Sequence, residues 1–320
     1  MEKAKLYKIG NTLVTIIIVF LSIYYLKSAF DSKVSNLNWQ SLSDVIGSNF
    51  LIVIVVVGLV PINWGLETLK WKWVLKETQN LSWAESIKSV LSGVTLSIIT
   101  PNGVGDYGGR MISIDRNQRS QALLYNGFLS LSQLLTTTVF GLLSFLVIGE
   151  KLTLPLHGSM LSIAVFVVII ACCWLYFKSK FRFGSIKLLL LKHKQQVSFE
   201  IPLNLRFQIL MLSILRYLVF CIQYVLLIRC FMPDVDLVIT FSSIAFVFLC
   251  TAIIPTGWLS GLLVRGSVSF FVFQTVLNSG ESGVIASTLL WIVNLLLPAI
   301  IGLYFIRSFK LFPFINPEKV

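Results

Sequence analysis

Two stretches decide the fold: SIITPNGVGDYGGR at residues 97–110 and AIIPTGWLSGLLVR at residues 252–265. Each closes a short apolar run with a proline and glycines and then ends on an arginine. In lipid, such a break leaves backbone N–H and C=O groups that need partners or a water-filled cavity. We therefore expect a polar pocket at each break. The residues expected to shape the breaks are Pro101, Gly103, Gly105, Pro255, Gly257 and Gly261.

The composition shows what surrounds these breaks. Of the 320 residues, 56% are hydrophobic and 12% are charged, whereas soluble domains carry about 25% charged residues. The bilayer must therefore be the main solvent, which excludes a soluble enzyme. The net charge of +12 arises from basic residues clustered between apolar runs, as cytoplasmic loops require, so we expect no nucleic-acid partner.

A spanning helix needs about 20 apolar residues, and we predict an all-α polytopic membrane protein in the plasma (inner) membrane. Runs of this kind lie at about 10–29, 48–66, 119–148, 157–177, 205–231 and 284–306, and shorter broken runs lie at 86–100 and 237–254. Basic loops place both termini in the cytoplasm. The loop charges fit six crossings with two re-entrant hairpins that enter from opposite faces. Eight crossings give the same loop signs and stay open.

The two breaks also indicate an internal repeat. Pro101 and Pro255 lie 154 positions apart, about half the chain. We predict one integral membrane domain over residues 1–320, with a first repeat at 48–148 and an inverted second repeat at 205–306. Inverted repeats whose broken helices meet near the midplane are typical of secondary transporters. Chance similarity between two proline breaks is the alternative.

Charged residues beside the breaks are the main candidates for substrate binding. Asp106 lies one helical turn before Arg110, and a guanidinium matches a phosphate bidentately. Arg110 is therefore the first candidate to contact a lipid phosphate, with a plain Asp106–Arg110 pair as the alternative. Arg265 has no acidic residue within ten positions. It binds a headgroup, reaches Asp106 or Glu67, or snorkels to the surface.

Three further residues complete the predicted substrate-binding set: Asn102, Glu67 and Gln133. Glu67 lies at a tryptophan-rich helix end, where we interpret Trp71 as an interfacial anchor. Gln133 belongs to a polar set on the run at 119–148 that lines a pathway or bonds neighbouring helices.

Other chemistry finds little support in the sequence. Gly103, Gly105 and Gly108 form a GxGxxG pattern, but no strand precedes it as a dinucleotide site requires. The chain contains no HExxH, GxSxG or P-loop motif, and its five cysteines form no CxxC pair. We expect no catalytic residue, no metal and no cofactor.

Several residues resemble a known family. Asn63, Leu69-Lys70-Trp71, Val74-Leu75, Pro101-x-Gly103-x-Gly105-Asp106 and Arg110 are similar to the membrane region of lysylphosphatidylglycerol synthases, a flippase-like family that also occurs as stand-alone membrane proteins. The resemblance covers about residues 10–310. It implies movement of an aminoacylated phospholipid across the bilayer, while a separate soluble domain performs the aminoacyl transfer.

This chain also departs from the family. It has Ser132, Gln133 and Thr136 where the resemblance implies a Glu-Arg pair and a later Asp, and Arg265 where it implies an acidic residue. Because few residues follow Lys310, we expect no synthase domain and no lysyl transfer.

These features together predict a flippase or transporter for an anionic or aminoacylated phospholipid, or for a lipid-linked intermediate. Membrane lipids are the expected partners, with a separate lipid-modifying enzyme as a further one. Two alternatives stay open. One is a membrane enzyme that acts on a lipid phosphate or a polyprenyl-linked sugar, for which Asp106 and Asp115 are the nearest acid–base pair. The other is a structural or accessory membrane subunit.

Overall fold

The computed structural model is built from helices, and the residues that it describes include no strand. Those residues are 44–100 except 46, 103–152, 158–178, 201–254 and 258–307. The first half contains α3 (Phe50–Leu75), α4 (Trp83–Ile99), α5 (Gly105–Arg110), the 3-10 turns η2 (Met111–Ser113) and η3 (Arg116–Gln118), and α6 (Arg119–Ile148). The second half contains α8 (Leu203–Phe231), α9 (Leu237–Ile253), α10 (Trp258–Leu277), α11 (Gly280–Trp291), the π-helical turn η4 (Ile292–Leu296) and α12 (Leu297–Arg307). Between the halves lies α7 (Gly158–Lys178).

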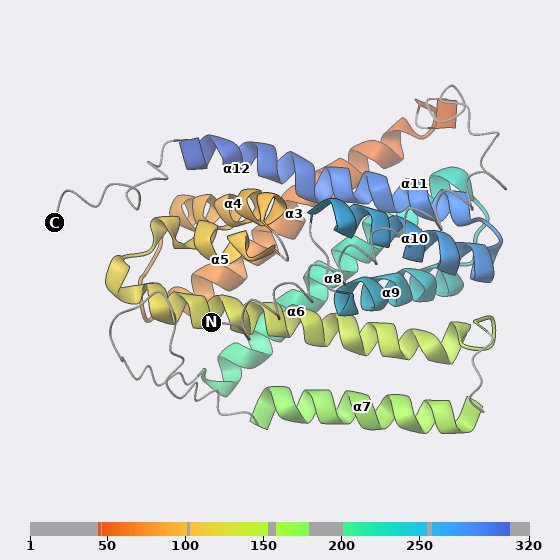
Figure 1. The fold of residues 1–320 in the computed structure, drawn as a ribbon, viewed down its shortest axis with the longest axis horizontal. Coiled ribbons are helices and arrows are strands. Elements are labelled where there is room, and N and C mark those ends of the chain that lie inside the picture. The colour runs from red at the N-terminus through yellow and green to blue at the C-terminus, as the bar shows by residue number, and fades with distance from the viewer. Residues whose placement is uncertain are drawn as a thin grey trace, which may run out of the picture.

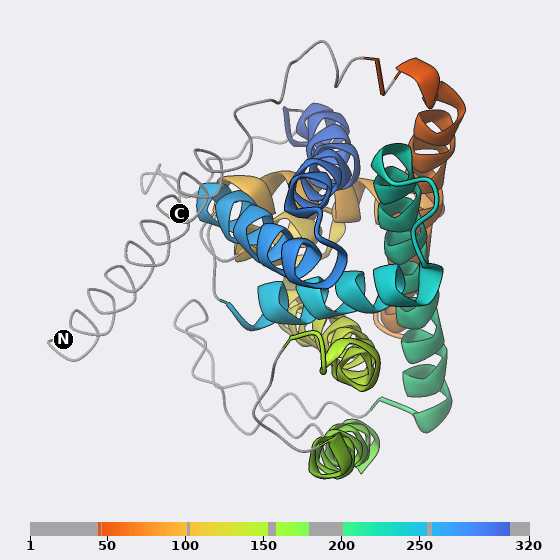
Figure 2. The same cartoon turned by 90° about the vertical axis from the view of Figure 1, so that its right-hand side faces the viewer.

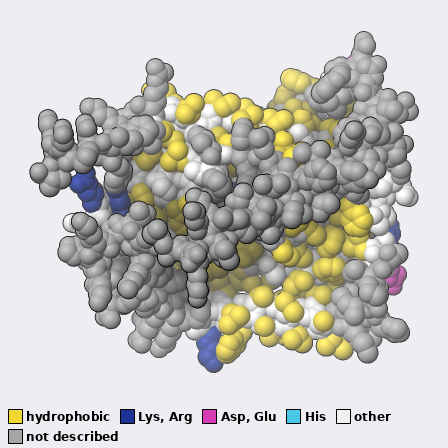
Figure 3. All heavy atoms as spheres, viewed as in Figure 1, with side chains coloured by type: hydrophobic (Ala, Val, Ile, Leu, Met, Phe, Trp, Pro, Cys, Tyr) yellow, Lys and Arg dark blue, Asp and Glu magenta, His cyan; other side chains and the backbone are white. Residues whose placement is uncertain are grey.

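Four helical segments are long and apolar enough to cross a membrane: Phe50–Leu75, Arg116–Ile148, Leu203–Phe231 and Gly280–Ile306. They coincide with four of the predicted runs, and α7 coincides with a fifth. The sixth run, at 10–29, lies outside the described residues. Large apolar side chains face outward, such as Ile170 of α7 at 66% exposure, and hydrophobic side chains cover much of the described surface in Figure 3. This length and composition are those of an α-helical membrane protein.

The first break forms a hairpin. Helix α4 begins at a capping box in which Ser82 and Glu85 each accept a hydrogen bond from the other's backbone N–H. It ends at Ile99, and Gly103 has a φ of +66°, a conformation that glycine tolerates. A Cβ at Gly105 would overlap the backbone of α4, so this glycine lets α5 fold back closely against α4.

The second break follows the same order of elements. Helix α9 has 17 residues, as α4 has, and the Asp236 carboxylate caps it by accepting from the N–H of Ile239 at 2.8 Å. The helix ends at Ile253 and the chain resumes as α10 at Trp258. Pro255 and Gly257 lie outside the described residues, as do Pro101 and Asn102, so their predicted roles stay predictions. Gly261 lies in the first turns of α10.

The two short hairpins occupy opposite halves of the molecule along its long axis. Figure 1 shows α4 and α5 toward one end and α9 and α10 toward the other, between the long helices. Figure 2, which looks along the long axis, shows α6 and α7 on one side of these hairpins and α12 on the other. The ends of α4 and α9 that precede the breaks both point to the middle of the molecule (Figure 1).

Two apolar cores lie on either side of a polar layer. One contains Trp71 of α3 and Ile209 of α8, and the other contains Val56 of α3 and Tyr217 of α8. The buried residues of α3 between these positions are polar, and α8 contributes the buried Ser213 and the partly buried Arg216 at the same level. Trp71 is fully buried and its Nε1 donates to Ser89 Oγ at 3.1 Å. The interpretation of Trp71 as an interfacial anchor is therefore wrong, because its ring is part of the protein interior.

Candidate functional site

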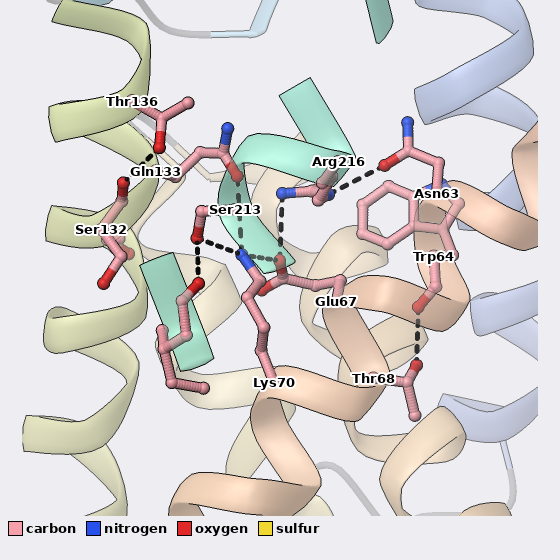
Figure 4. A network of polar contacts seen from close by, with 12 residues as sticks. Asn63, Trp64, Glu67, Thr68, Lys70, Ser132, Gln133, Thr136, Ser213 and Arg216 are labelled. Atoms are coloured by element: carbon pink, nitrogen blue, oxygen red, sulfur yellow. Dashed lines mark hydrogen bonds and ion pairs between the residues drawn. The ribbon is translucent and has the colours of Figure 1, made fainter. Parts of the chain in front are cut away.

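The polar layer is centred on one carboxylate, Glu67 of α3. Its oxygens lie 2.7 Å from Lys70 Nζ, 2.8 Å from Arg110 Nη2 and 3.0 Å from Arg216 Nη1. The Glu67 side chain is only 5% exposed. Figure 4 shows it between Lys70 of the same helix and Arg216 of α8. A single buried carboxylate thus joins cations from α3, α5 and α8.

Arg110 is held by two carboxylates. Besides Glu67, its Nε lies 3.0 Å from both carboxylate oxygens of Asp106, which also accepts from Asn126 Nδ2 at 2.9 Å. The guanidinium lies over the ring of Trp71, 5.3 Å from its centroid. The Asp106–Arg110 pair, the alternative to phosphate contact, is therefore present, and the side chain of Arg110 is 6% exposed. Contact between Arg110 and a lipid phosphate stays a prediction.

Lys70 is completely buried. Its ammonium donates to Ser213 Oγ of α8 at 3.3 Å and to Gln133 Oε1 of α6 at 3.5 Å, as Figure 4 shows. A lysine is almost never fully buried unless it is paired. The predicted Gln133 therefore does belong to the polar layer, where it contacts Lys70 and also borders a cavity.

Arg216 is positioned by a chain of side-chain amides. Its Nε donates to Asn63 Oδ1 at 2.8 Å, Asn63 Nδ2 donates to Asn294 Oδ1 at 3.0 Å, and Asn294 Nδ2 donates to Gln223 Oε1 at 3.0 Å. Gln223 Nε2 donates in turn to the Val56 carbonyl at 2.8 Å. The chain crosses between α3, α8 and η4, so it ties the two halves together.

The π-helical turn explains why Asn294 reaches this chain. A π turn disturbs the regular helical ladder and often marks a functional site. Here the backbone carbonyl of Asn294 accepts from Trp64 Nε1 at 3.0 Å, while its side chain faces Asn63 and Gln223. The backbone carbonyl and the side-chain amide of Asn294 therefore both hydrogen-bond to α3, in the other half of the chain.

Beside this layer lies a cavity of about 290 Å³. Arg216 and Arg265 both line it, and none of the described aspartates or glutamates does. Its polar neighbours are Gln133, Thr137, Thr251 and Asn294, and its aromatic ones are Trp64, Tyr217, Phe220, Phe248 and Trp291. The cavity therefore combines positive charge with an apolar wall.

Arg265 differs from Arg110 and Arg216 in its charge partners. It forms no ion pair with a carboxylate in the described part of the chain, and its Nε is buried without a hydrogen-bond partner among the same residues. The alternative in which Arg265 reaches Asp106 or Glu67 is therefore wrong, because Glu67 pairs with Lys70, Arg110 and Arg216, and Asp106 pairs with Arg110. A buried charge is costly unless it is paired, and the described carboxylates leave the charge of Arg265 uncompensated.

The structure brings some predicted residues together and adds others. Glu67, Asp106 and Arg110 share one ionic layer with Gln133, whereas Arg265 lies on the cavity and Asn102 falls outside the described residues. Arg216, Asn294 and Gln223 were not among the predicted site residues. A charge inside the apolar run at 205–231 is the signal that marks Arg216 as an intramembrane site residue. Asn294 and Gln223 are polar residues in apolar runs, a signal that indicates a need for partners without naming them.

No metal-binding group of three or more His, Cys, Asp or Glu side chains occurs among the residues that the structure describes. Comparison with protein-family models, curated proteins and solved structures finds no match. The resemblance to the membrane region of lysylphosphatidylglycerol synthases thus stays a prediction. The charges and geometry of the site are the basis for the function proposed for it.

Proposed function

We propose that this membrane protein binds lipids by a negatively charged headgroup and moves them between the two leaflets. The observation that carries the proposal is a cavity that Arg216 and Arg265 line and that no carboxylate in the described part of the chain reaches. Guanidinium groups match phosphate oxygens in a planar fork. A charged cavity among membrane-length helices is expected to serve a substrate, since charge at membrane depth is otherwise costly.

The proposed pathway uses the two hairpins. We propose six full crossings and two re-entrant hairpins, in an inverted repeat with cytoplasmic termini in the plasma membrane. Support comes from the equal lengths of α4 and α9, their breaks at a proline, and their placement in opposite halves of the molecule (Figure 1). In secondary transporters, such broken helices border the substrate site.

The three arginines of the site have different proposed roles, according to whether they line the cavity. Arg110 is occupied by Glu67 and Asp106, so we propose that it anchors the ionic layer. Arg216 has contacts on both sides, with Glu67 in the layer and with the cavity. Arg216 and Arg265 are therefore the proposed headgroup ligands. A headgroup phosphate that approaches Arg216 competes with Glu67, which couples occupancy of the cavity to the packing of α3 on α8.

Transbilayer movement in vesicles tests this proposal. The purified protein is reconstituted with fluorescent phosphatidylglycerol, and dithionite reports the fraction of lipid that reaches the outer leaflet over time. We expect Arg265→Gln to slow movement about tenfold or more, since a charge-assisted hydrogen bond contributes about 1.5–3 kcal/mol. Arg229→Gln is the matched control, because Arg229 lies on α8 away from the cavity.

The same assay separates the alternatives. Equal rates for the folded Arg265→Gln variant, the wild type and empty vesicles would contradict lipid movement and favour a structural subunit. A change in lipid mass that requires the protein would favour a membrane enzyme instead.

A further inference from the structure

We infer that the cavity selects a phosphate group that carries two negative charges, such as a phosphomonoester or a diphosphate. It disfavours a singly charged phosphodiester and, more strongly, an aminoacylated headgroup. The inference rests on the proposed function for the location of the site, but it makes a separate claim about charge.

The ionic layer carries an excess of positive charge. Glu67 and Asp106 supply two negative charges, and Lys70, Arg110 and Arg216 supply three positive ones. Every one of these groups is within ion-pair distance of another member of the layer. One positive charge is therefore left over, and Arg216 is the only one of the three cations that also borders the cavity.

Arg265 adds a second positive charge beside the cavity. It comes from α10 and lines the same cavity as Arg216 of α8. Its Nε is buried with no hydrogen-bond partner among the described residues. The excess therefore totals two positive charges, and both guanidinium groups border one space. A dianion placed between them neutralises this excess, whereas a monoanion leaves one buried charge uncompensated.

The size and wall of the cavity suit a phosphate attached to a carbon chain. A volume of about 290 Å³ has room for one phosphate or diphosphate. The aromatic part of the wall, which includes Phe248 and Trp291, provides apolar contact for the carbon chain next to the phosphate.

A cationic headgroup finds no opposite charge in the cavity. No described carboxylate lines the cavity, and Glu67 is shared by three cations. Aromatic faces attract ammonium groups, but two of the rings in the wall already face a cation: the guanidinium of Arg216 lies 5.0 Å from the ring centroid of Trp64 and 5.4 Å from that of Phe220. A lysyl group would therefore add positive charge beside Arg216 and Arg265.

Lipid binding to the full chain tests the inference. Purified protein in nanodiscs of phosphatidylcholine is titrated with phosphatidic acid, phosphatidylglycerol or lysylphosphatidylglycerol, and bound lipid is counted by native mass spectrometry. We expect phosphatidic acid to bind about tenfold or more tightly than phosphatidylglycerol, and lysylphosphatidylglycerol to bind least. Inorganic phosphate, added as a competitor, distinguishes a lipid site from a site for the free ion.

A matched pair of variants isolates the effect of charge. Thr251 lines the cavity, and its hydroxyl donates to the carbonyls of Val247 and Phe248 in its own helix. The glutamate and glutamine side chains have nearly the same size, and both substitutions remove the hydrogen bonds of the Thr251 hydroxyl. We expect Thr251→Glu to weaken phosphatidic acid binding about tenfold relative to Thr251→Gln. Arg265→Gln should remove the preference for the dianion, and Arg229→Gln should keep it.

The outcomes separate this inference from the proposed function. Equal binding of phosphatidic acid and phosphatidylglycerol, with movement of either lipid lost in Arg265→Gln, overturns the inference and leaves the function standing. Preferred binding of phosphatidic acid or inorganic phosphate, without transbilayer movement, supports the inference and overturns the function. Equal affinities in Thr251→Glu and Thr251→Gln overturn the inference even if Arg265→Gln fails to fold.

Discussion

Glu67 and Arg216 form an ion pair across the two halves of the chain, with Glu67 Oε2 3.0 Å from Arg216 Nη1. Glu67 comes from α3 and Arg216 from the middle of the 29-residue helix α8. The pair is the point at which the ionic layer meets the cavity. In the proposed function, a lipid headgroup competes with Glu67 for the guanidinium of Arg216. Headgroup binding is then coupled to the packing of α3 on α8.

Removal of the Glu67 charge should destabilise the protein strongly. Glu67→Gln leaves Lys70, Arg110 and Arg216 without their shared carboxylate. Breaking a buried pair in this way costs about 3–5 kcal/mol, so we expect a clearly lower Tm in detergent. Glu77→Gln, at an exposed position beyond the same helix, should change the free energy of unfolding by about 0.5 kcal/mol or less. Similar Tm values for both variants would contradict the role of Glu67.

Two glycines of α5 should respond very differently to alanine. A Cβ at Gly105 would overlap the Leu96 carbonyl of α4, whereas a Cβ at Gly108 has nothing within 4 Å. We expect Gly105→Ala to cost about 1–3 kcal/mol by overpacking, and Gly108→Ala to be neutral or stabilising because alanine favours helix. Thermal unfolding of both variants measures the difference. The close packing of α5 on α4 is refuted if Gly105→Ala is as stable as Gly108→Ala.

The amide chain predicts energetic coupling between distant sequence positions. Asn63 and Asn294 are 231 residues apart and share a hydrogen bond of 3.0 Å. In a double-mutant cycle of Asn63→Ala and Asn294→Ala, we expect a coupling energy of about 0.5–3 kcal/mol. Asn63→Ala combined with Ser48→Ala, at an exposed and distant site, should be additive. Additive behaviour of both pairs would show that the amide chain does not act as a unit.

Cysteine labelling tests the inverted repeat. The native cysteines are first replaced, and single cysteines are introduced at Asn80, Asn117 or Asp234, which are exposed and lie outside the α-helices. We expect a membrane-impermeant reagent to label positions 80 and 117 from the cytoplasmic side and position 234 from the opposite side. Labelling of positions 80 and 234 from the same side would rule out two hairpins that enter from opposite faces.

Much of the helical architecture was predictable because it depends on local composition. The runs at 48–66, 119–148 and 205–231 lie largely within α3, α6 and α8, and α4 and α9 both end before a proline. The Asp106–Arg110 pair was also within reach, since residues one helical turn apart on one helix meet regardless of the fold.

Other parts of the site depend on which helices are neighbours. The sequence places Glu67 at a tryptophan-rich helix end, yet Glu67 and its neighbour Lys70 are buried because α5, α6 and α8 cover them. Asn294 bonds Asn63 only because η4 turns its side chain toward α3. A polar residue in an apolar run shows that a partner is needed, but the partner's position in the chain depends on packing.

The two broken stretches at 97–110 and 252–265, with the apolar runs around them, determined by themselves that this chain is an α-helical protein for lipid surroundings with two interrupted helices. Hydrophobic length and backbone hydrogen bonding act locally, so the sequence carries them directly. Only the tertiary structure decided which arginine is occupied and which is available: Arg110 meets two carboxylates, and Arg265 meets none among the described residues. Electrostatic pairing acts through space, so it depends on residues that the chain brings together from distant positions.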